Sequence, residues 1–211
     1  MTWPRTAGYG ERGLDTDEVA EDPFTQFQLW FEEWAATDPY DPTAVALATA
    51  DETGRPSVRF VLLKGVDHGF VFFTNYGSRK GRELASNPQA SLCFGWIGLE
   101  RQVRAVGAVQ QVSEDESDAY FASRPRGSQL GAWASDQSRP VADRAALERR
   151  WADTDESFPD DDVPRPPYWG GYRLVPDEVE FWQGRPNRMH DRLAYLRTAV
   201  ADPWTIERLQ P

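Results

Sequence analysis

The sequence predicts a mainly β fold with peripheral helices (α+β), in the form of an antiparallel split or closed β-barrel. Three observations lead to this fold class. Short runs rich in β-branched and aromatic residues recur along the chain, tight turns separate the first of these runs, and helices do not alternate with strands as in a doubly wound sheet. Short turns favour antiparallel pairing, and closure into a barrel removes exposed strand edges.

Two parts are expected along the 211 residues of the chain. Residues 1–21 are polar and rich in glycine, so we expect a flexible N-terminal arm. Residues 22–211 are expected to form a single domain, because a chain of this length can bury a full hydrophobic core. The domain begins with a helix, since Asp22 can cap it and Pro23 suits its first position. The aromatic stripe of this helix is more typical of core packing than of a cofactor site, and it comprises Phe24, Phe27, Trp30, Phe31 and Trp34.

Three strands are expected next, over residues 44–50, 57–64 and 70–75. The turns between them are short, so the three strands are expected to pair as an antiparallel meander. The remaining elements are a short helix from Ser78, strands at 90–96 and 101–112, helices over 113–124 and near 140–152, paired strands at 171–183 and 188–197, and a last strand at 204–209.

Charge and composition exclude several classes of protein. The net charge of -11 argues against nucleic acid or an anionic membrane as a partner, because either needs a broad basic surface. No apolar run is long enough to span a bilayer and no segment resembles a signal peptide, so a cytoplasmic protein is expected. The single cysteine, Cys93, cannot form an internal disulfide, and no spacing of histidine and cysteine suits zinc, so no metal site is expected.

The segment FWQGRPNRMHDR, residues 181–192, places Arg188, His190 and Arg192 at a spacing of two. If the chain is extended from Arg188 onward, these side chains project from one face and form a row that favours an anion. A row on the solvated face of a sheet is the alternative. The row closely follows Trp182 and contains one of only two histidines in the chain, which favours a functional site.

Basic residues also gather at Ser78, Arg79 and Lys80. They follow a strand and begin a helix, where free main-chain N–H groups and the helix dipole favour a phosphate. A capped turn with solvated basic residues is the alternative. Lys64 and Lys80 are the only lysines among 23 basic residues, which indicates positions that need a compact ammonium for a point contact.

The segment AYFASRPRGSQLGAW indicates a second anion site. Tyr120 and Arg124 are four residues apart and so share a helix face, and Ser128 can fold back towards them after the break at Pro125. Solvation of a helix end is the alternative. Gln102 lies on a strand with small or apolar neighbours, so its amide can face inward and meet the edge of a heteroaromatic ring, although exposed strand glutamines are commoner.

No familiar catalytic motif competes with these sites. The sequence has no Gly-x-Ser-x-Gly elbow, no Walker loop and no Gly-x-Gly-x-x-Gly after a strand. Two anion sites, aromatic residues and the lack of a nucleophile indicate that a cofactor supplies the reactivity and that the protein positions it.

Several motifs resemble, in the same order, those of the pyridoxamine (pyridoxine) 5'-phosphate oxidase family. They are RFVLLK, FFTNYGSRKGREL, LERQVR, YFASRPRGSQLGAWAS, WGGYRL, FWQGRPNRMHDR and the terminal ERLQP. The resemblance covers nearly everything from Asp22 to Pro211, and SRPRGSQ and RMHDR are its most specific segments. It implies an FMN-binding split-barrel homodimer with FMN in the subunit interface. It also implies oxidation of pyridoxamine 5'-phosphate or pyridoxine 5'-phosphate to pyridoxal 5'-phosphate, with O2 as electron acceptor and H2O2 as product.

The resemblance further implies a role for each matching residue. The FMN site would comprise Arg59, Phe60, Val61, Leu62, Leu63, Lys64, Phe73, Thr74, Arg79, Lys80, Gln102, Gln137, Ser138, Trp182 and Arg192. The substrate would be bound by Lys64, Tyr120, Arg124, Ser128, Arg188 and His190, of which Arg188 and His190 would be catalytic. Phe73 departs from a tyrosine of some relatives, and Tyr9, Gly13 and Leu14 match the family's leader only loosely.

The reaction implied by the resemblance is hydride transfer from C4' of the substrate to N5 of FMN, with the pyridine ring stacked on the flavin. Arg188 and His190 would orient the amine or alcohol at C4', and an imidazole can move protons near neutral pH. Two alternatives stay open. The chain could be a related split-barrel flavoprotein that acts on another substrate, such as a phenazine precursor, or a non-catalytic protein that stores flavin or pyridoxal phosphate.

Overall fold

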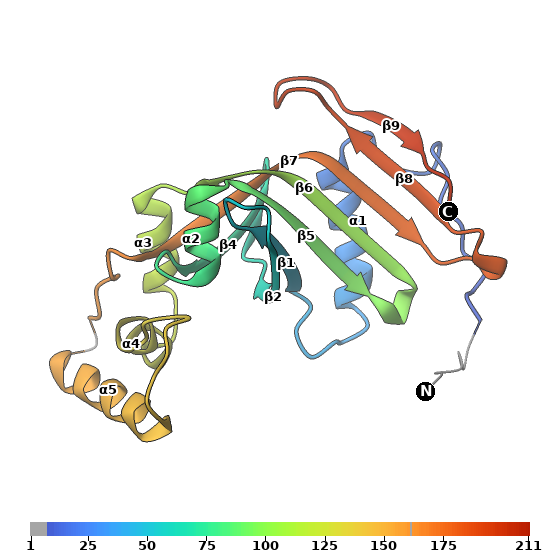
Figure 1. Cartoon of the computed structure of the whole chain (residues 1–211). Helices are drawn as coiled ribbons and strands as arrows, with labels where there is room; N and C mark the ends of the chain where they lie inside the picture. The colour runs from blue at the N-terminus through green and yellow to red at the C-terminus, as the bar shows by residue number, and fades with distance from the viewer. Residues whose placement is uncertain (1–7, 161) are drawn as a thin grey trace.

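A computed structural model describes residues 8–160 and 162–211, in which the strands form one curled antiparallel sheet (Figure 1). The described residues contain nine strands in the order β2-β1-β5-β6-β7-β4-β3, with β8 paired to β7 and β9 paired to β8. The strands are β1 (Ala44–Ala50), β2 (Pro56–Leu62), β3 (Gly65–Val66), β4 (Phe70–Asn75), β5 (Gln89–Trp96), β6 (Arg101–Gln111), β7 (Trp169–Gln183), β8 (Asp191–Leu196) and β9 (Thr205–Arg208). The helices are α1 (Pro23–Ala35), α2 (Arg79–Ser86), α3 (Glu114–Ala122), α4 (Arg126–Ala134) and α5 (Arg144–Ser157), with short 3-10 helices η1 (Ile97–Leu99) and η2 (Pro186–Arg188).

The long strand β7 joins the two parts of the curled sheet. Its first half pairs with β4 and its second half with β8, while β6 pairs with both halves. The register between β6 and β7 shifts at Gly107. A Cβ atom at Gly107 would lie 2.2 Å from the carbonyl oxygen of Val175, so this irregularity requires glycine.

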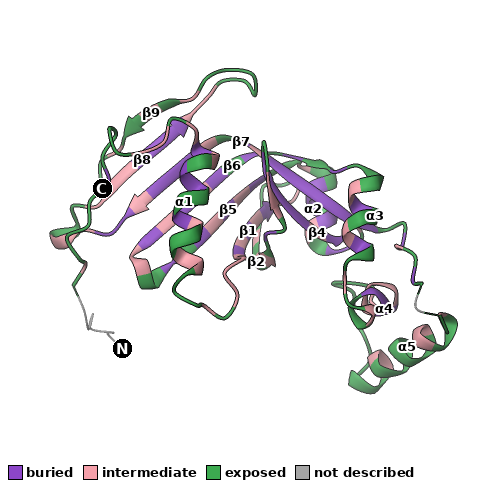
Figure 2. Ribbon diagram, turned by 180° about the vertical axis from the view of Figure 1, so that it is seen from behind, coloured by how far each residue is buried: buried purple, intermediate pink, exposed green. Residues whose placement is uncertain are grey.

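Helix α1 covers one face of the sheet, as Figure 2 shows. The Asp22 side chain accepts a hydrogen bond from the Thr25 main-chain N–H, and Pro23 lies in the first turn, as the sequence predicts. Phe27 and Trp30 are buried, so the aromatic stripe is a core contact. Their rings contact Phe70, Phe94, Trp96 and Phe181 of the sheet.

The opposite side of the sheet is not covered by α1, and in Figure 1 strands β5 and β6 lie in front of that helix. Two cross-strand rows define what we call the open face. One runs from Phe60 through Ala46 and Cys93 to Arg104, and the other runs from Val58 through Ala48 and Ser91 to Val106. Residues that are directly opposite each other in antiparallel strands share a face, so each row lies on one side of the sheet.

Apolar side chains are unusually exposed on the open face. Val58 and Phe60 are 70% and 77% exposed, and Leu62 on the same strand is 41% exposed. The neighbouring strand β1 contributes only alanines to this face. A contiguous apolar area with small residues beside it is typical of a surface that another protein covers.

The predicted meander of three strands is wrong for its third strand. β1 and β2 pair as an antiparallel hairpin, but β4 pairs with β3 and β7 at the other end of the strand order. The chain bends after β2, and the Lys64 main-chain N–H then donates to the carbonyl oxygen of Val71. The short turn at 67–69 therefore joins β3 to β4. The second partner of β4 is β7, and the length of this turn does not predict that pairing.

Helix α4 has no counterpart among the elements predicted from the sequence. Pro125 ends the preceding helical segment, as expected, but it also stands directly before the first residue of α4. The polar segment after it is therefore a second helix and not only a connection. Helix α5 begins later than the predicted helix near 140–152, because the Asp143 side chain caps it by accepting from the Ala146 N–H.

Within the described part of the arm, Leu14 and Ala20 contact strands β8 and β9. Leu14 is buried, its N–H donates to Asp191, and its carbonyl oxygen accepts from Arg208. The Tyr195 hydroxyl donates to the carbonyl oxygen of Ala20. Residues 1–7 lie outside the described residues, and the flexibility of the arm stays a prediction.

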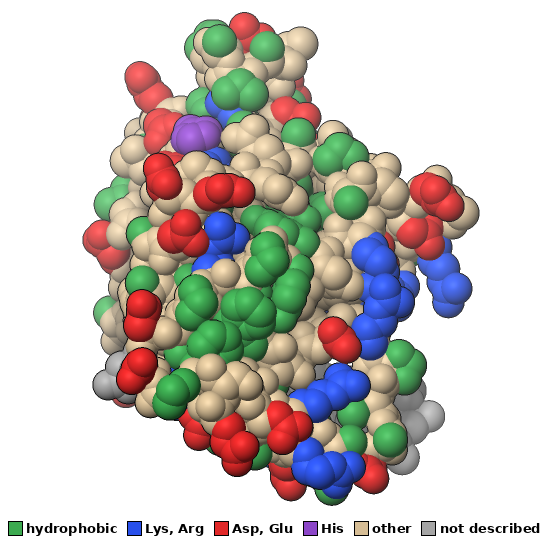
Figure 3. All heavy atoms as spheres, turned by 90° about the vertical axis from the view of Figure 1, so that its left-hand side faces the viewer, with side chains coloured by type: hydrophobic (Ala, Val, Ile, Leu, Met, Phe, Trp, Pro, Cys, Tyr) green, Lys and Arg blue, Asp and Glu red, His purple; other side chains and the backbone are tan. Residues whose placement is uncertain are grey.

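Acidic side chains are spread over the face of the molecule drawn in Figure 3, with an area of hydrophobic side chains in the middle of that face. This distribution agrees with the net charge of -11. Every helix in the described part of the chain is too short or too polar to cross a bilayer.

Candidate functional site

A cavity of about 280 Å³, lined by residues of both β2 and β4, brings together many of the residues that the sequence selected. We call it the cationic cavity, because three of its lining side chains are basic and none is acidic. Its lining residues are Phe60, Val61, Leu62, Lys64, Phe73, Thr74, Lys80, Tyr120, Arg124, Gln137 and Trp169. In a chain with a net charge of -11, such a local excess of positive charge favours an anion.

Three stacked rings form one wall of the cationic cavity. The ring centres of Phe73 and Tyr120 are 4.0 Å apart, and those of Phe73 and Trp169 are 5.5 Å apart. A Cβ atom at Gly171 would lie 2.8 Å from the Phe73 ring, so the WGGY motif makes room for this stack. The Arg124 guanidinium lies over the Trp169 ring at 4.6 Å.

Arg124 has an unmet hydrogen-bonding requirement. Its Nη1 atom is buried and has no hydrogen-bond partner among the described residues. Burial lowers the pKa of Arg124, and Tyr120 offsets part of this effect. A buried guanidinium N–H without an acceptor is rare, and a phosphate oxygen would satisfy it. Ser128 lines an adjoining cavity that Arg124 also lines.

Lys80 lies at the other side of the cationic cavity. Its Nζ donates to the Thr74 hydroxyl at 3.0 Å and to the Gln137 side-chain oxygen at 3.1 Å. Burial and the nearby Arg59 lower the pKa of Lys80 to about 8, although Glu83 opposes this shift. The Ser78 side chain caps α2, so Lys80 stands in the first turn of a helix that follows a strand, as predicted. This ammonium can donate to a phosphate only while it is protonated.

Arg59 and Arg79 are held by Glu83 of α2. The Glu83 carboxylate accepts from Arg79 Nε at 2.8 Å and from Arg59 Nη2 at 3.1 Å. Burial alone would raise the pKa of Glu83, but the hydroxyls of Ser57 and Thr49 and the two arginines together lower it to about 2. Arg59 does not line the cationic cavity, and Leu63, another residue of the predicted FMN segment, is buried in the core.

The remaining predicted residues form a second group at the β8 end of the sheet. We call Gln102, Trp182, Arg188, His190 and Arg192 the C-terminal group. Gln102, Trp182 and Arg192 are direct cross-strand neighbours on β6, β7 and β8, so they share one face. Arg192 donates to both oxygens of the buried Glu180, at 2.8 and 2.9 Å.

His190 lies beside Trp182, with ring centres 4.6 Å apart, and the Tyr9 ring packs edge-on against it at 4.9 Å. Its Nδ1 accepts a hydrogen bond from the Arg185 main-chain N–H at 3.1 Å. A nitrogen that accepts from a fixed N–H carries no proton, so in the neutral ring the proton is on Nε2.

The expectation that the chain is extended from Arg188 onward is wrong. Arg188 belongs to η2 and has a φ angle of 63°, and β8 begins only at Asp191. Strand alternation therefore does not place Arg188, His190 and Arg192 on one face. A tight turn carries Arg188, which is exposed, and the local hydrogen bonds of that turn override the spacing.

No member of the C-terminal group lines the cationic cavity. Figure 1 shows α3 and β8 at opposite ends of the sheet. Gln137 lines the cavity, and its neighbour Ser138 has a positive φ angle of 69° in the loop before α5. One chain therefore presents the predicted site as two separate groups.

The sequence did not single out several residues that contribute to these groups. Trp169 was missed, although its place in WGGY directly before a strand was visible. Glu180 is a charged residue within the apolar run VEFW, which is a usable signal for a buried, paired carboxylate. Arg185 is recognised only from its contact with His190.

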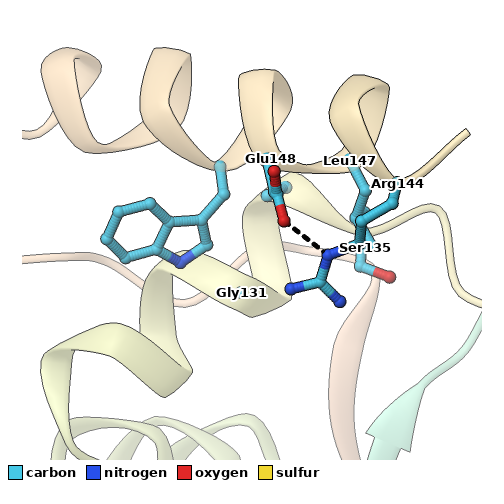
Figure 4. Close-up of a pocket in the computed structure, with 7 residues that line it drawn as sticks. Gly131, Ser135, Arg144, Leu147 and Glu148 are labelled. Carbon is cyan, nitrogen blue, oxygen red and sulfur yellow. Dashed lines mark hydrogen bonds and ion pairs between the residues drawn. The ribbon is translucent and has the colours of Figure 1, made fainter.

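A further cavity of about 470 Å³ lies between α4 and α5 (Figure 4). Arg144 and Glu148 form an ion pair at its edge. Its lining includes none of the site residues predicted from the sequence. The described residues also contain no group of three or more His, Cys, Asp and Glu side chains that could hold a metal ion.

Two family models match the chain. One, described as pyridoxamine 5'-phosphate oxidase, matches residues 31–156, and the other, described as the pyridoxine 5'-phosphate oxidase C-terminal dimerisation region, matches residues 169–211. The pyridoxine/pyridoxamine 5'-phosphate oxidase of Burkholderia ambifaria is 58% identical over 205 residues, which cover 96% of this chain and 95% of that protein. The protein of the same name from Burkholderia thailandensis is 57% identical with the same coverage.

Solved structures show the same fold. PhzG from Burkholderia lata, in complex with tetrahydrophenazine-1-carboxylic acid, aligns with a TM-score of 0.87 and 33% identity, covering 95% of this chain and 99% of that chain. A pyridoxamine 5'-phosphate oxidase-related, FMN-binding protein from Nostoc punctiforme aligns with a TM-score of 0.71 and 20% identity, covering 92% of this chain and all of that chain. The predicted fold class, an antiparallel split barrel with peripheral helices, is confirmed.

Proposed function

Because this chain belongs to the pyridoxamine 5'-phosphate oxidase family, we propose that it is the FMN-dependent oxidase of pyridoxamine 5'-phosphate and pyridoxine 5'-phosphate. Its product would be pyridoxal 5'-phosphate, with O2 as electron acceptor and H2O2 as the second product. The observation that carries the proposal is the cationic cavity, in which Lys64, Lys80 and Arg124 face an aromatic wall without a carboxylate. Phosphorylated aromatic molecules match this combination of charge and flat apolar surface.

The cationic cavity supplies two kinds of contact to phosphates. Arg124 offers its unpartnered Nη1 beside Tyr120, which suits the substrate phosphate. Lys80 offers its ammonium next to Thr74 and Gln137, which suits the phosphate of FMN. The residues present therefore fit both groups. FMN, when bound, supplies the acceptor for a hydride from the substrate and passes the electrons to O2.

Within the C-terminal group, Arg188 and His190 would supply the chemistry at the reacting end of the substrate, and Gln102, Trp182 and Arg192 would contact FMN. His190 is held by the Arg185 N–H on one side and by two aromatic rings on its faces, so its orientation is fixed. With Nδ1 used as an acceptor, Nε2 is the atom that exchanges a proton with the amine or alcohol. Arg188 is exposed at the tip of its turn, where its guanidinium can orient that group.

A homodimer would bring the two groups together. The C-terminal group is remote from the cationic cavity within one chain, and both border the open face with its exposed Val58 and Phe60. The match of residues 169–211 to a dimerisation region supports pairing through this part of the fold. In the dimer, the cavity of one protomer would receive the C-terminal group of its partner, and each site would be complete only across the interface.

The open face gives the dimer a direct test. Val58→Asp should convert the protein into a monomer, because a buried carboxylate without a partner costs about 3 to 5 kcal/mol in each protomer. Analytical ultracentrifugation should show the lower mass, and oxidase activity should be lost with it. Val200→Asp is the control, since Val200 is also exposed but lies in the loop between β8 and β9. A Val58→Asp protein that stays dimeric would contradict this use of the open face.

FMN binding should depend on pH through Lys80. Because the pKa of Lys80 is about 8, flavin-free protein loses this charge above pH 8, and FMN binding must then return a proton to it. The affinity for FMN should fall as the pH rises above 8, by up to about tenfold per pH unit, whereas riboflavin, which lacks the phosphate, should show no such decline. Flavin fluorescence quenching measures both affinities. Lys80→Arg, which stays charged, should flatten the FMN profile; an unchanged profile in that variant would contradict the role of Lys80.

The substrate requires its own assay, because PhzG binds a phenazine carboxylic acid on the same fold. Purified protein should form aldehyde and peroxide in equal amounts from pyridoxamine 5'-phosphate and from pyridoxine 5'-phosphate under air. A yellow protein that consumes no O2 with either compound would favour storage of flavin or pyridoxal phosphate. Oxidation of a reduced phenazine carboxylic acid in preference to both phosphates would favour the second enzymatic alternative.

A further inference from the structure

The loop of residues 184–191, which carries Arg188 and His190, has a backbone conformation that is unfavourable without contacts from surrounding residues. Asn187 and Arg188 have φ angles of 57° and 63°, in the left-handed region. Asparagine visits this region fairly often, but a long side chain such as arginine does so rarely. Two such residues in succession persist only where surrounding contacts determine the loop.

Arg185, near the start of the loop, provides such contacts to the two residues at the end of the loop. Its main-chain N–H donates to His190 Nδ1 at 3.1 Å, and its Nε lies 3.5 Å from Oδ2 of Asp191. Its Nη1 also donates to the carbonyl oxygen of Glu11. Arg185 thereby links both residues at the end of the loop to the N-terminal arm.

The ends of the loop are fixed independently of its middle. The Gly184 N–H donates to the carbonyl oxygen of Glu100 at 2.7 Å, and Asp191 pairs with Arg208 at 2.7 Å. Between them, one further local bond joins the Met189 N–H to the carbonyl oxygen of Pro186. The guanidinium of Arg185 is therefore the side chain that spans the loop from one end to the other.

We propose that Arg185 is a positioning residue whose guanidinium, by bridging Asp191 and the main chain at Glu11, keeps Arg188 and His190 in the geometry that the reaction requires. This proposal rests on the proposed function, because it assigns Arg188 and His190 to the substrate's reacting carbon. Arg185 itself does not touch the reacting atoms. Its contribution is to prevent the turn from relaxing out of the left-handed conformation.

Arg185→Ala should lower kcat by about tenfold or more, since a displacement of about 1 Å at catalytic groups has effects of this size. The KM for pyridoxamine 5'-phosphate and the affinity for FMN should each change less than about threefold, because the cationic cavity is not altered. Arg185→Lys should give an intermediate kcat, since an ammonium can reach only one of the two partners. The matched control is Arg197→Ala, which removes another guanidinium that caps carbonyl oxygens, those of Pro176 and Val200.

Hydrogen exchange supplies a readout that does not depend on activity. Amides of residues 184–191 should exchange faster in the Arg185→Ala and Arg185→Lys proteins than in the wild type, and Arg197→Ala should leave them unchanged. In a double-mutant cycle, Arg185→Ala combined with Asp191→Asn should be little worse than the more impaired single variant. Unchanged exchange in this loop, or losses of FMN affinity equal to the loss of kcat, would overturn the proposal. A wild-type protein that oxidises neither phosphate would overturn the proposed function, and the exchange data would still decide whether Arg185 holds the loop.

Discussion

Replacement of His190 by alanine should lower kcat by about 10²- to 10⁴-fold, the range for loss of a positioned acid or base. Arg188→Ala should also lower turnover strongly, because that guanidinium would orient the group at C4'. Neither change should alter the retention of FMN by more than a few fold, since the contact assigned to the FMN phosphate is made by Lys80 beside Thr74 and Gln137. Lys80→Ala should do the reverse, with weak FMN binding and near-normal turnover once FMN is saturating. Stopped-flow flavin reduction, together with FMN titration, separates these effects.

The chain contains a matched control for the histidine. His68 is the other histidine, it is largely exposed, and its Nδ1 lies 3.4 Å from Asp67 in the turn before β4. His68→Ala should leave both turnover and FMN affinity unchanged. Equal loss of flavin in the Arg188, His190 and Lys80 variants would contradict the division of the site into a binding part and a reacting part.

Arg124→Ala should cause the largest loss of substrate affinity. Removing one partner of a buried, charge-assisted hydrogen bond costs about 2 to 5 kcal/mol, so the KM for pyridoxamine 5'-phosphate should rise roughly 30-fold or more. The unpartnered, buried Nη1 is the reason for expecting an effect of this size. Steady-state kinetics measured with FMN at saturation provides the KM.

Unphosphorylated pyridoxamine is the internal control for this substitution. The wild-type protein should use it poorly, and Arg124→Ala should not make it much poorer, because the lost contact is to the phosphate. Arg124→Lys should recover part of the affinity through its charge, but not the planar contact over Trp169. If Arg124→Ala impairs both substrates equally, the guanidinium acts by supporting the fold and not by binding the phosphate.

The sequence determined those features that depend on neighbours along the chain. The cap and proline of α1, its aromatic stripe, the first strands and the basic start of α2 are all local, and the structure has them where the residues predict them. The motifs around Lys64, Lys80, Tyr120 and Arg124 also selected residues that line one cavity. Short-range spacing carries this information because helix and strand periods fix which side chains share a face.

Only the tertiary structure decided which distant segments meet. β4 pairs with β7 and not with β2, a long-range pairing that the lengths of the intervening turns do not reveal. Arg59 pairs with Glu83 and does not line the cationic cavity. The buried Glu83 carboxylate binds the Arg59 guanidinium more strongly than water would. Arg188 lies in a turn and not in the predicted strand, because a hydrogen bond between Arg185 and His190 closes that turn. The spacing of two between the basic residues carries no information about this bond. Pairing, burial and loop closure are cooperative, long-range terms, and they decided the separation of the two groups of predicted residues within one chain.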